Sequence, residues 1–172
     1  MLKNSGEILY TKGKNDECYT PRNAVALVLE FLEPFRDKII WCPFDTCDSQ
    51  FVKVLTEKGF NVVYSHLNTG QDFYEYEPKD WDLIVSNPPF TNKRKIFERC
   101  IKFEKPFCLL MSMVWLNDTA PFEVFGEYLQ LLAIKGRVEY LDANGICMGR
   151  PSFASGYYCK DFLPKTLCVR KL

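Results

Sequence analysis

The residue group with the clearest capacity for chemistry is Asn87-Pro88-Pro89-Phe90, which directly follows a mostly apolar run at 82–86. Two consecutive prolines fix two backbone φ angles at about −65° and remove two N–H donors. The resulting rigid turn presents carbonyl oxygens and the Asn87 amide beside an aromatic ring. Such a turn suits a planar amino group, because the Asn87 Oδ1 and the Pro88 carbonyl accept its two hydrogens while Phe90 stacks on the ring that carries it.

A basic cluster, Lys93, Arg94 and Lys95, follows this turn and opens the next predicted helix. Cations at a helix N-terminus oppose the helix dipole, by about 0.3–1 kcal/mol each when exposed. An unfavourable placement beside a reactive turn indicates a role, and phosphate contact with a nucleic acid fits it. The alternative is a solvated helix face.

The elements that must position these residues are predicted from apolar periodicity. A helix begins at Thr20 as N-cap, with Pro21 as its first helical residue, and ends near Pro34. Further helices are expected over about 49–58, 92–103 and 121–134, and strands over 39–42, 61–65, 82–86, 107–111, 138–141, 157–159 and 166–169. This alternation predicts a single α/β, doubly wound, Rossmann-like domain. Its mostly parallel seven-stranded sheet would carry an antiparallel C-terminal strand pair.

In doubly wound sheets, ligands bind outside the carboxyl ends of the strands. Three stretches with reactive or polar residues lie at such ends, namely 42–49, 65–73 and 86–92. The sequence therefore predicts one shared cavity at this edge.

Length and composition bound the remaining possibilities. With 172 residues and 47% apolar content, one packed domain over 19–172 is expected, preceded by an N-terminal arm over 1–18. Lys plus Arg equals Asp plus Glu at 22 each, so affinity for nucleic acid cannot rest on bulk charge. Eight cysteines without a CxxC pair, and one histidine, predict no metal site and a reduced protein. No signal region or membrane span is recognisable, which favours a soluble, cytoplasmic protein.

The sequence resembles the compact, phage-type class I adenine-N6 DNA methyltransferases. The resemblance rests on the Asn-Pro-Pro-Phe turn, on Tyr19-Thr20-Pro21 and on the closing stretch 156–164. The likeness extends from about Tyr19 to the end. It implies methyl transfer from S-adenosyl-L-methionine to the N6 amino group of adenine, with Asn87, Pro88, Pro89 and Phe90 as catalytic residues. The cofactor-binding residues implied by the resemblance or by position are Tyr19, Thr20, Pro21, Pro43, Phe44, Asp45, Ser49, His66, Asp72, Phe73 and Asn87.

Two departures from the family pattern keep alternatives open. The loop at 42–49 contains no glycine, and Ser65-His66 stands where an acidic residue usually receives the ribose hydroxyls. His66 either bonds a hydroxyl or is an exposed loop residue. Besides DNA adenine, an RNA adenine or a protein glutamine amide offers a planar amino group. A methyltransferase-like binding protein without turnover is a further reading.

A base inside a duplex cannot reach such a turn, so the target must be flipped out or single-stranded. Family members that recognise a sequence usually carry an added target-recognition region. Few residues here remain for one. Specificity is therefore expected to be slight, to come from short loops, or to be supplied by a partner or a second copy.

Overall fold

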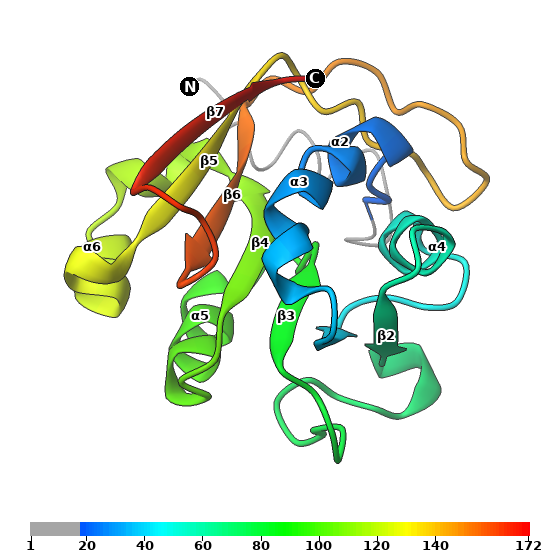
Figure 1. The fold of residues 1–172 in the computed structure, drawn as a ribbon. Coiled ribbons are helices and arrows are strands. Elements are labelled where there is room, and N and C mark those ends of the chain that lie inside the picture. Colours follow the sequence, from blue (N-terminus) through cyan, green and yellow to red (C-terminus); the bar gives the residue numbers. More distant parts are fainter. Residues whose placement is uncertain (1–17) are drawn as a thin grey trace.

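The computed structural model describes residues 18–172, and it places seven strands in one sheet (Figure 1). Their order across the sheet is β2-β1-β3-β4-β6-β5-β7, with β6 antiparallel to both neighbours and the other pairings parallel. The strands are β1 Ile39–Cys42, β2 Asn61–Tyr64, β3 Leu83–Ser86, β4 Phe107–Ser112, β5 Gln130–Lys135, β6 Ser155–Lys160 and β7 Leu167–Lys171. The predicted fold class, a doubly wound Rossmann-like sheet, is confirmed.

Helices cover both faces of this sheet (Figure 1). Those on one face are α2 Arg22–Ala26, α3 Leu29–Leu32 and α4 Gln50–Glu57, while α5 Lys93–Lys102 and α6 Ala120–Phe125 lie on the other. Short 3-10 turns complete the described elements: η1 Glu33–Phe35, η2 Leu67–Thr69, η3 Met113–Asn117 and η4 Gly126–Tyr128.

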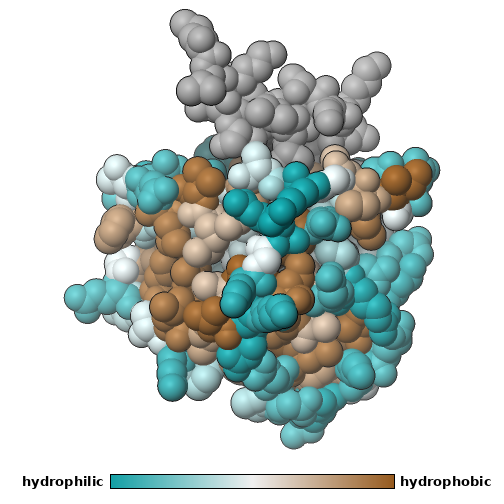
Figure 2. Space-filling model, turned by 90° about the horizontal axis from the view of Figure 1, so that it is seen from above, coloured by the Kyte–Doolittle hydropathy of each residue, from teal (hydrophilic) through white to brown (hydrophobic). Residues whose placement is uncertain are grey.

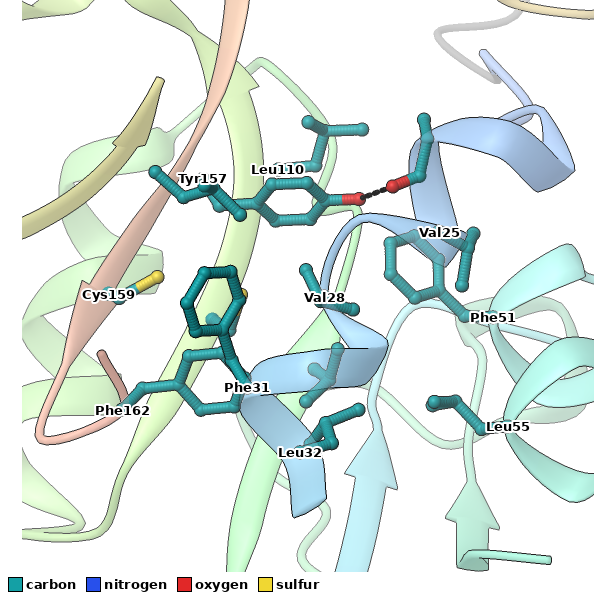
Figure 3. Close-up of a cluster of buried hydrophobic side chains, with 14 of the residues drawn as sticks. Val25, Val28, Phe31, Leu32, Phe51, Leu55, Leu110, Tyr157, Cys159 and Phe162 are labelled. Carbon is teal, nitrogen blue, oxygen red and sulfur yellow. Dashed lines mark hydrogen bonds between the residues drawn. The ribbon is translucent and has the colours of Figure 1, made fainter. Parts of the chain in front are cut away.

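Alternate residues of the strands contribute their side chains to two separate hydrophobic cores, one on each face of the sheet. In β3, Leu83 and Val85 pack into the core under α2, α3 and α4, whereas Ile84 packs into the core under α5 and α6. This follows from the strand geometry, since successive side chains point to opposite faces. In the first core the Tyr157 hydroxyl donates a hydrogen bond of 2.8 Å to the Ala24 carbonyl (Figure 3), which ties β6 to α2.

The second core is rich in aromatic rings. Trp41 lies 5.0 Å from Trp81 and 5.6 Å from Phe73 between ring centroids. On the same face, Phe97 of α5 stacks on Trp115 at 5.0 Å. These rings bury a large apolar area between the sheet and the helices α5 and α6.

Two sequence predictions in the second half of the chain are wrong. The helix expected over 121–134 stops at Phe125, because Gly126 adopts a positive φ of 52°, and residues 130–135 form β5 instead. Pairing with β6 and β7 on its two sides outweighs the helical spacing of its apolar residues. The strand expected over 138–141 is no member of the sheet. Only Leu141 makes isolated bridges, to Tyr19 and Cys147.

Smaller boundaries also differ from the prediction. Pro21 is the N-cap and α2 begins at Arg22, so Thr20 does not cap the helix. The region expected as one helix is divided into α2, α3 and η1. The two C-terminal strands form as expected but do not pair with each other, because β5 lies between them. The predicted arm over 1–18 lies outside the described residues except for Cys18.

Seen from above, the surface mixes hydrophobic and hydrophilic residues, with hydrophilic ones dominating the right and lower rim (Figure 2). Within residues 18–172, no helix combines the length and the apolar character needed to cross a bilayer.

Candidate active site

A cavity of about 630 Å³ lies at the carboxyl edge of the sheet, where β1, β2 and β3 end. The three stretches predicted to meet at this edge all contribute to its wall. The lining consists of Cys18, Tyr19, Thr20, Pro43, Phe44, Asp45, Thr46, Ser49, Gln50, Phe51, His66, Leu67, Asn68, Asp72, Phe73, Tyr74, Asn87, Pro88, Pro89, Phe90 and Ile96. A volume of this size accommodates a small-molecule cofactor, since such pockets measure about 300–1,000 Å³.

The Asn87 side chain has one satisfied end and one unsatisfied end. Its Nδ2 donates a hydrogen bond of 2.9 Å to the Cys18 carbonyl. That contact fixes the orientation of the amide, because a flipped amide would set oxygen against oxygen. The Oδ1 atom is buried and has no hydrogen-bond partner among the described residues. A buried acceptor without a partner is costly, so a donor is expected to come from the cavity.

Tyr19 and Thr20 belong to a segment that lines the cavity next to Asn87. Tyr19 exchanges two backbone hydrogen bonds with Leu141, of 2.9 and 2.8 Å, which hold the segment at the cavity. The Thr20 hydroxyl is a second buried polar atom without a partner within residues 18–172. Pro21 is absent from the cavity lining among the described residues and serves instead to start α2.

Asp45 is the acidic residue most enclosed by the site, with only 5% of its surface exposed. The Ser86 hydroxyl donates a hydrogen bond to its carboxylate, and the Asp45 N–H donates to the Ser65 carbonyl at 3.1 Å. Asp45 therefore joins the ends of β1, β2 and β3. Burial raises the pKa of Asp45 to about 6, and hydrogen bonds from Ser86 and Ser49 oppose that rise.

Ser49 stabilises the glycine-free loop rather than the helix that follows. Its Oγ accepts a hydrogen bond of 3.0 Å from the Thr46 N–H, and its own N–H donates to the Thr46 carbonyl. Although Ser49 is the N-cap of α4, its side chain makes no capping bond there. Asp48 points outward and pairs with Lys53 at 3.0 Å, so Asp45 is the loop acid available to a ligand.

The loop after β2 supplies His66, Asp72 and Phe73 to the cavity. The Asn68 N–H donates to the His66 Nδ1 at 3.1 Å, which sets the ring orientation and leaves Nε2 as the donor of a neutral imidazole. The Asp72 Oδ1 accepts from the Tyr74 N–H at 3.0 Å. Phe73 is buried and packs on Phe44 with centroids 4.7 Å apart, so the two rings form one apolar wall.

The proline turn follows β3 directly and lines the cavity with Asn87, Pro88, Pro89 and Phe90. Pro88 is buried, Pro89 is exposed, and Phe90 is half-buried at the rim of the cavity. Phe90 meets Tyr140 and Phe153 edge-on, at 6.0 and 5.8 Å between centroids. These contacts fix the plane of the Phe90 ring.

The basic cluster lies outside the cavity, at the start of α5. Arg94 makes ion pairs with Glu98 at 2.8 Å and with Glu123 at 2.6 Å. The Lys93 ammonium lies 5.8 Å from the Trp115 ring centroid. Lys95 is exposed and makes no ion pair within residues 18–172. The three cations thus differ in their freedom to meet an external anion.

Several lining residues were not predicted from the sequence, among them Gln50, Leu67, Tyr74 and Ile96. Gln50 and Ile96 belong to helices whose N-terminal ends face the cavity, and this could have been inferred from the positions of α4 and α5 after β1 and β3. Leu67 is 67% exposed and Tyr74 is 39% exposed, and no sequence pattern distinguished them from other loop residues.

The described residues hold no group of three or more His, Cys, Asp or Glu suited to a metal ion. All eight cysteines are free thiols. Burial raises the pKa of the Cys42 and Cys100 thiols, so these two are inert parts of the cores.

A scan against protein-family models finds no match, and no curated protein matches the chain. Among solved structures, a modification subunit of a candidate type I restriction enzyme from Vibrio vulnificus YJ016 superposes with a TM-score of 0.54 at 14% sequence identity. The match covers 95% of this chain and 48% of the other, so the chain spans about half the length of that protein. The chain therefore shares its fold with the matched half of this modification subunit.

Proposed function

We propose that the protein is an S-adenosyl-L-methionine-dependent methyltransferase that methylates the N6 amino group of adenine in DNA. The observation that carries the proposal is the buried Asn87 Oδ1, an acceptor without a partner in the described chain, at the wall of a cofactor-sized cavity. A neutral amino group is the donor that this acceptor fits, and the following Pro88 carbonyl offers the second acceptor.

The cavity residues suit the proposed cofactor. Asp45 is the partner for the ammonium of the methionine part, and the Thr20 hydroxyl is a donor for its carboxylate. The wall formed by Phe44 and Phe73 suits an adenine ring, and the His66 Nε2 would donate to a ribose hydroxyl. When bound, S-adenosyl-L-methionine supplies an electrophilic methyl group on its sulfonium.

In this proposal Asn87 and Pro88 act on the nucleophile. An exocyclic amine is a weak nucleophile because its lone pair is delocalised into the ring. Two acceptors on its hydrogens favour a pyramidal nitrogen, and the fixed Phe90 ring holds the base in line with the donor. Catalysis would rest on positioning and oriented dipoles rather than on a strong base.

DNA is proposed ahead of RNA and protein substrates because the structural neighbour is a modification subunit of a restriction enzyme. The experiment is incubation with tritiated cofactor and separate pools of DNA, RNA and protein. Label in DNA, at adenine N6 after nucleoside digestion, supports the proposal. Label found only in RNA or only in protein would contradict DNA as the substrate and would identify the substrate class instead.

Asn87→Ala is the matched variant for this assay. It should lower methyl transfer by at least about 100-fold, since removing one oriented group at a reacting centre costs about 2.7–4 kcal/mol. Cofactor affinity by calorimetry should change little. An Asn87→Ala protein that methylates as fast as the wild type would rule out the mechanism. If the wild-type protein binds no cofactor, the protein is no methyltransferase, and the alternative of a methyltransferase-like binding protein without turnover remains.

A further inference from the structure

Ser86 is a polar residue at the end of a strand that is otherwise apolar. It is the last residue of β3, none of its surface is exposed, and the three residues before it are buried and apolar. Its backbone is held in register with Leu109 of β4. A buried hydroxyl needs a partner, and this one donates to the Oδ2 atom of Asp45. The place of Ser86 in the sheet therefore fixes the position of the Asp45 carboxylate.

Asp45 is a buried carboxylate without a cation. It makes no ion pair within residues 18–172, while the hydroxyls of Ser86 and Ser49 bond to it. Buried charges are normally paired, and a carboxylate accepts more hydrogen bonds than two hydroxyls supply. Because Asp45 lines the cavity, a cation is expected to reach it from there.

We propose that Ser86 is a positioning residue for the cofactor, whose hydroxyl holds the ionised Asp45 carboxylate in place for the ammonium of the methionine part. The inference rests on the proposed function and extends it to a residue outside the cavity lining. In that function Asn87 contacts the target amine, whereas Ser86, one residue earlier in the chain, acts on the cofactor through Asp45.

Removal of the Ser86 hydroxyl should make Asp45 harder to ionise. Burial raises the pKa of Asp45 to about 6, and the hydrogen bond from Ser86 opposes that rise more strongly than the one from Ser49. Without it the pKa should rise further, so the charged form is lost at a higher pH. Cofactor affinity should then fall at neutral pH and recover in more alkaline solution.

Other titratable groups near Asp45 do not produce such a shift. Cys42 and Tyr157 interact with it from β1 and β6, and burial raises the pKa of both, so they stay neutral over the pH range of the test. Further titratable side chains line the cavity, namely Cys18, Tyr19, His66, Asp72 and Tyr74. Since all of these are the same in the wild type and in a Ser86 variant, a difference between the two pH profiles reports on Asp45.

The test measures Kd by calorimetry for two probes between pH 5.5 and 8.5. S-adenosyl-L-homocysteine carries the ammonium of the cofactor, whereas methylthioadenosine has the adenosine and the thioether but no amino-acid part. The proteins are wild type, Ser86→Ala, Asp45→Asn, the double variant and Ser65→Ala. Ser65 is a matched control because it is 1% exposed, follows β2 directly, and its hydroxyl accepts a hydrogen bond of 2.9 Å from the Trp41 Nε1. Urea denaturation shows whether each variant is folded.

We expect Ser86→Ala to bind S-adenosyl-L-homocysteine about 10-fold more weakly than the wild type at pH 7, because a hydrogen bond to a charged group is lost. The difference should shrink toward pH 8.5, and the Kd for methylthioadenosine should not change. Ser65→Ala should keep the wild-type pH profile. In the Asp45→Asn background, Ser86→Ala should have no further effect on either probe.

Equal weakening for both probes, or a wild-type pH profile in folded Ser86→Ala, would overturn the positioning role and leave the methyltransferase proposal standing. If Ser86→Ala does not fold, Ser86→Cys should show the same shift, since a thiol is close in size to the hydroxyl and a weaker donor. An unshifted Ser86→Cys profile would then overturn the role. A wild type that binds neither probe would refute both proposals.

Discussion

The substitution Asp45→Asn tests whether the buried Asp45 carboxylate lowers the stability of the folded protein while it serves to bind the cofactor. The ordinary pKa of this carboxyl is 3.8, and burial raises it to about 6 in the folded protein. Since one unit of pKa corresponds to about 1.36 kcal/mol, ionising Asp45 in the fold costs about 3 kcal/mol more than ionising it in the unfolded chain. At pH 7 the folded protein carries this cost.

The sign of the pH dependence follows from the raised pKa. The folded state binds the Asp45 proton more tightly, so this contribution to stability is fully present below about pH 4 and is lost as the pH rises through about 6. Asn resembles the neutral carboxyl and can still accept from the Ser86 hydroxyl. Asp45→Asn should therefore gain stability over the wild type between pH 4 and pH 7, by up to about 3 kcal/mol.

The assay is urea denaturation of both proteins at several pH values from 4.5 to 8, together with calorimetric titration of S-adenosyl-L-methionine. The stabilised variant should bind the cofactor about 10- to 100-fold more weakly, because the ammonium loses a charged partner. Asp48→Asn is the control. It lies three positions on, its side chain is 83% exposed, and it should show no such pH-dependent gain. A stability difference that is equal at pH 5 and pH 8 would refute the buried-charge reasoning, and unchanged cofactor affinity would remove Asp45 from the ammonium site.

Three further predictions concern the cavity and the residues around it. Thr20→Val removes a buried hydroxyl without a partner in the described chain, so unfolding should cost the same or about 1 kcal/mol more while cofactor affinity falls about 10-fold, as read by calorimetry. Arg99→Ala removes the guanidinium that lies 5.5 Å from the centroid of Phe73, which lines the cavity; because this contact supports the wall that Phe44 and Phe73 form, its loss should raise the cofactor Kd read by calorimetry. Lys105→Ala removes an ammonium 3.8 Å from the centroid of Trp81, which is no part of the cavity lining among the described residues, and should lower stability alone. Lys95→Ala should reduce the log–log salt slope of duplex DNA binding by about 0.9, and Arg94→Ala should reduce it less because Glu98 and Glu123 already pair with Arg94.

The sequence was most informative where local and global signals agree. The strands at 39–42, 61–64, 83–86 and 107–112 were predicted within a residue or so, because short apolar runs between polar loops leave few alternatives. The same apolar runs predicted the position of the cavity, because the loops that follow parallel strands all lie at one edge of the sheet. The turn after β3 was found from its two prolines and its amide, which need no tertiary information.

The second half of the chain was harder, because long-range pairing determines it. Residues 130–135 have helical spacing of apolar side chains, yet they pair with both β6 and β7. The position of β6 between β4 and β5 depends on strands that follow later in the chain, and no local window contains that information. The sequence also could not predict that the side-chain oxygens of Thr20 and Asn87 are buried without a hydrogen-bond partner among the described residues, because burial and partners are known only from the folded structure.

Ser86, the last residue of β3, and Asn87, which follows it, connect the two halves of the proposed reaction. The Ser86 hydroxyl bonds to Asp45 in the loop assigned to the cofactor, and the next side chain, Asn87, bonds to Cys18 beside Tyr19 and Thr20. Because the two residues are adjacent in the chain, the end of β3 holds both the Asp45 loop and the segment at Cys18 in place. This arrangement explains why the Asn87 Oδ1 can stay without a partner. The amide cannot turn away to satisfy it, because the contact with Cys18 and the buried end of β3 hold the side chain in place, and that restraint is what a site that positions an amine requires.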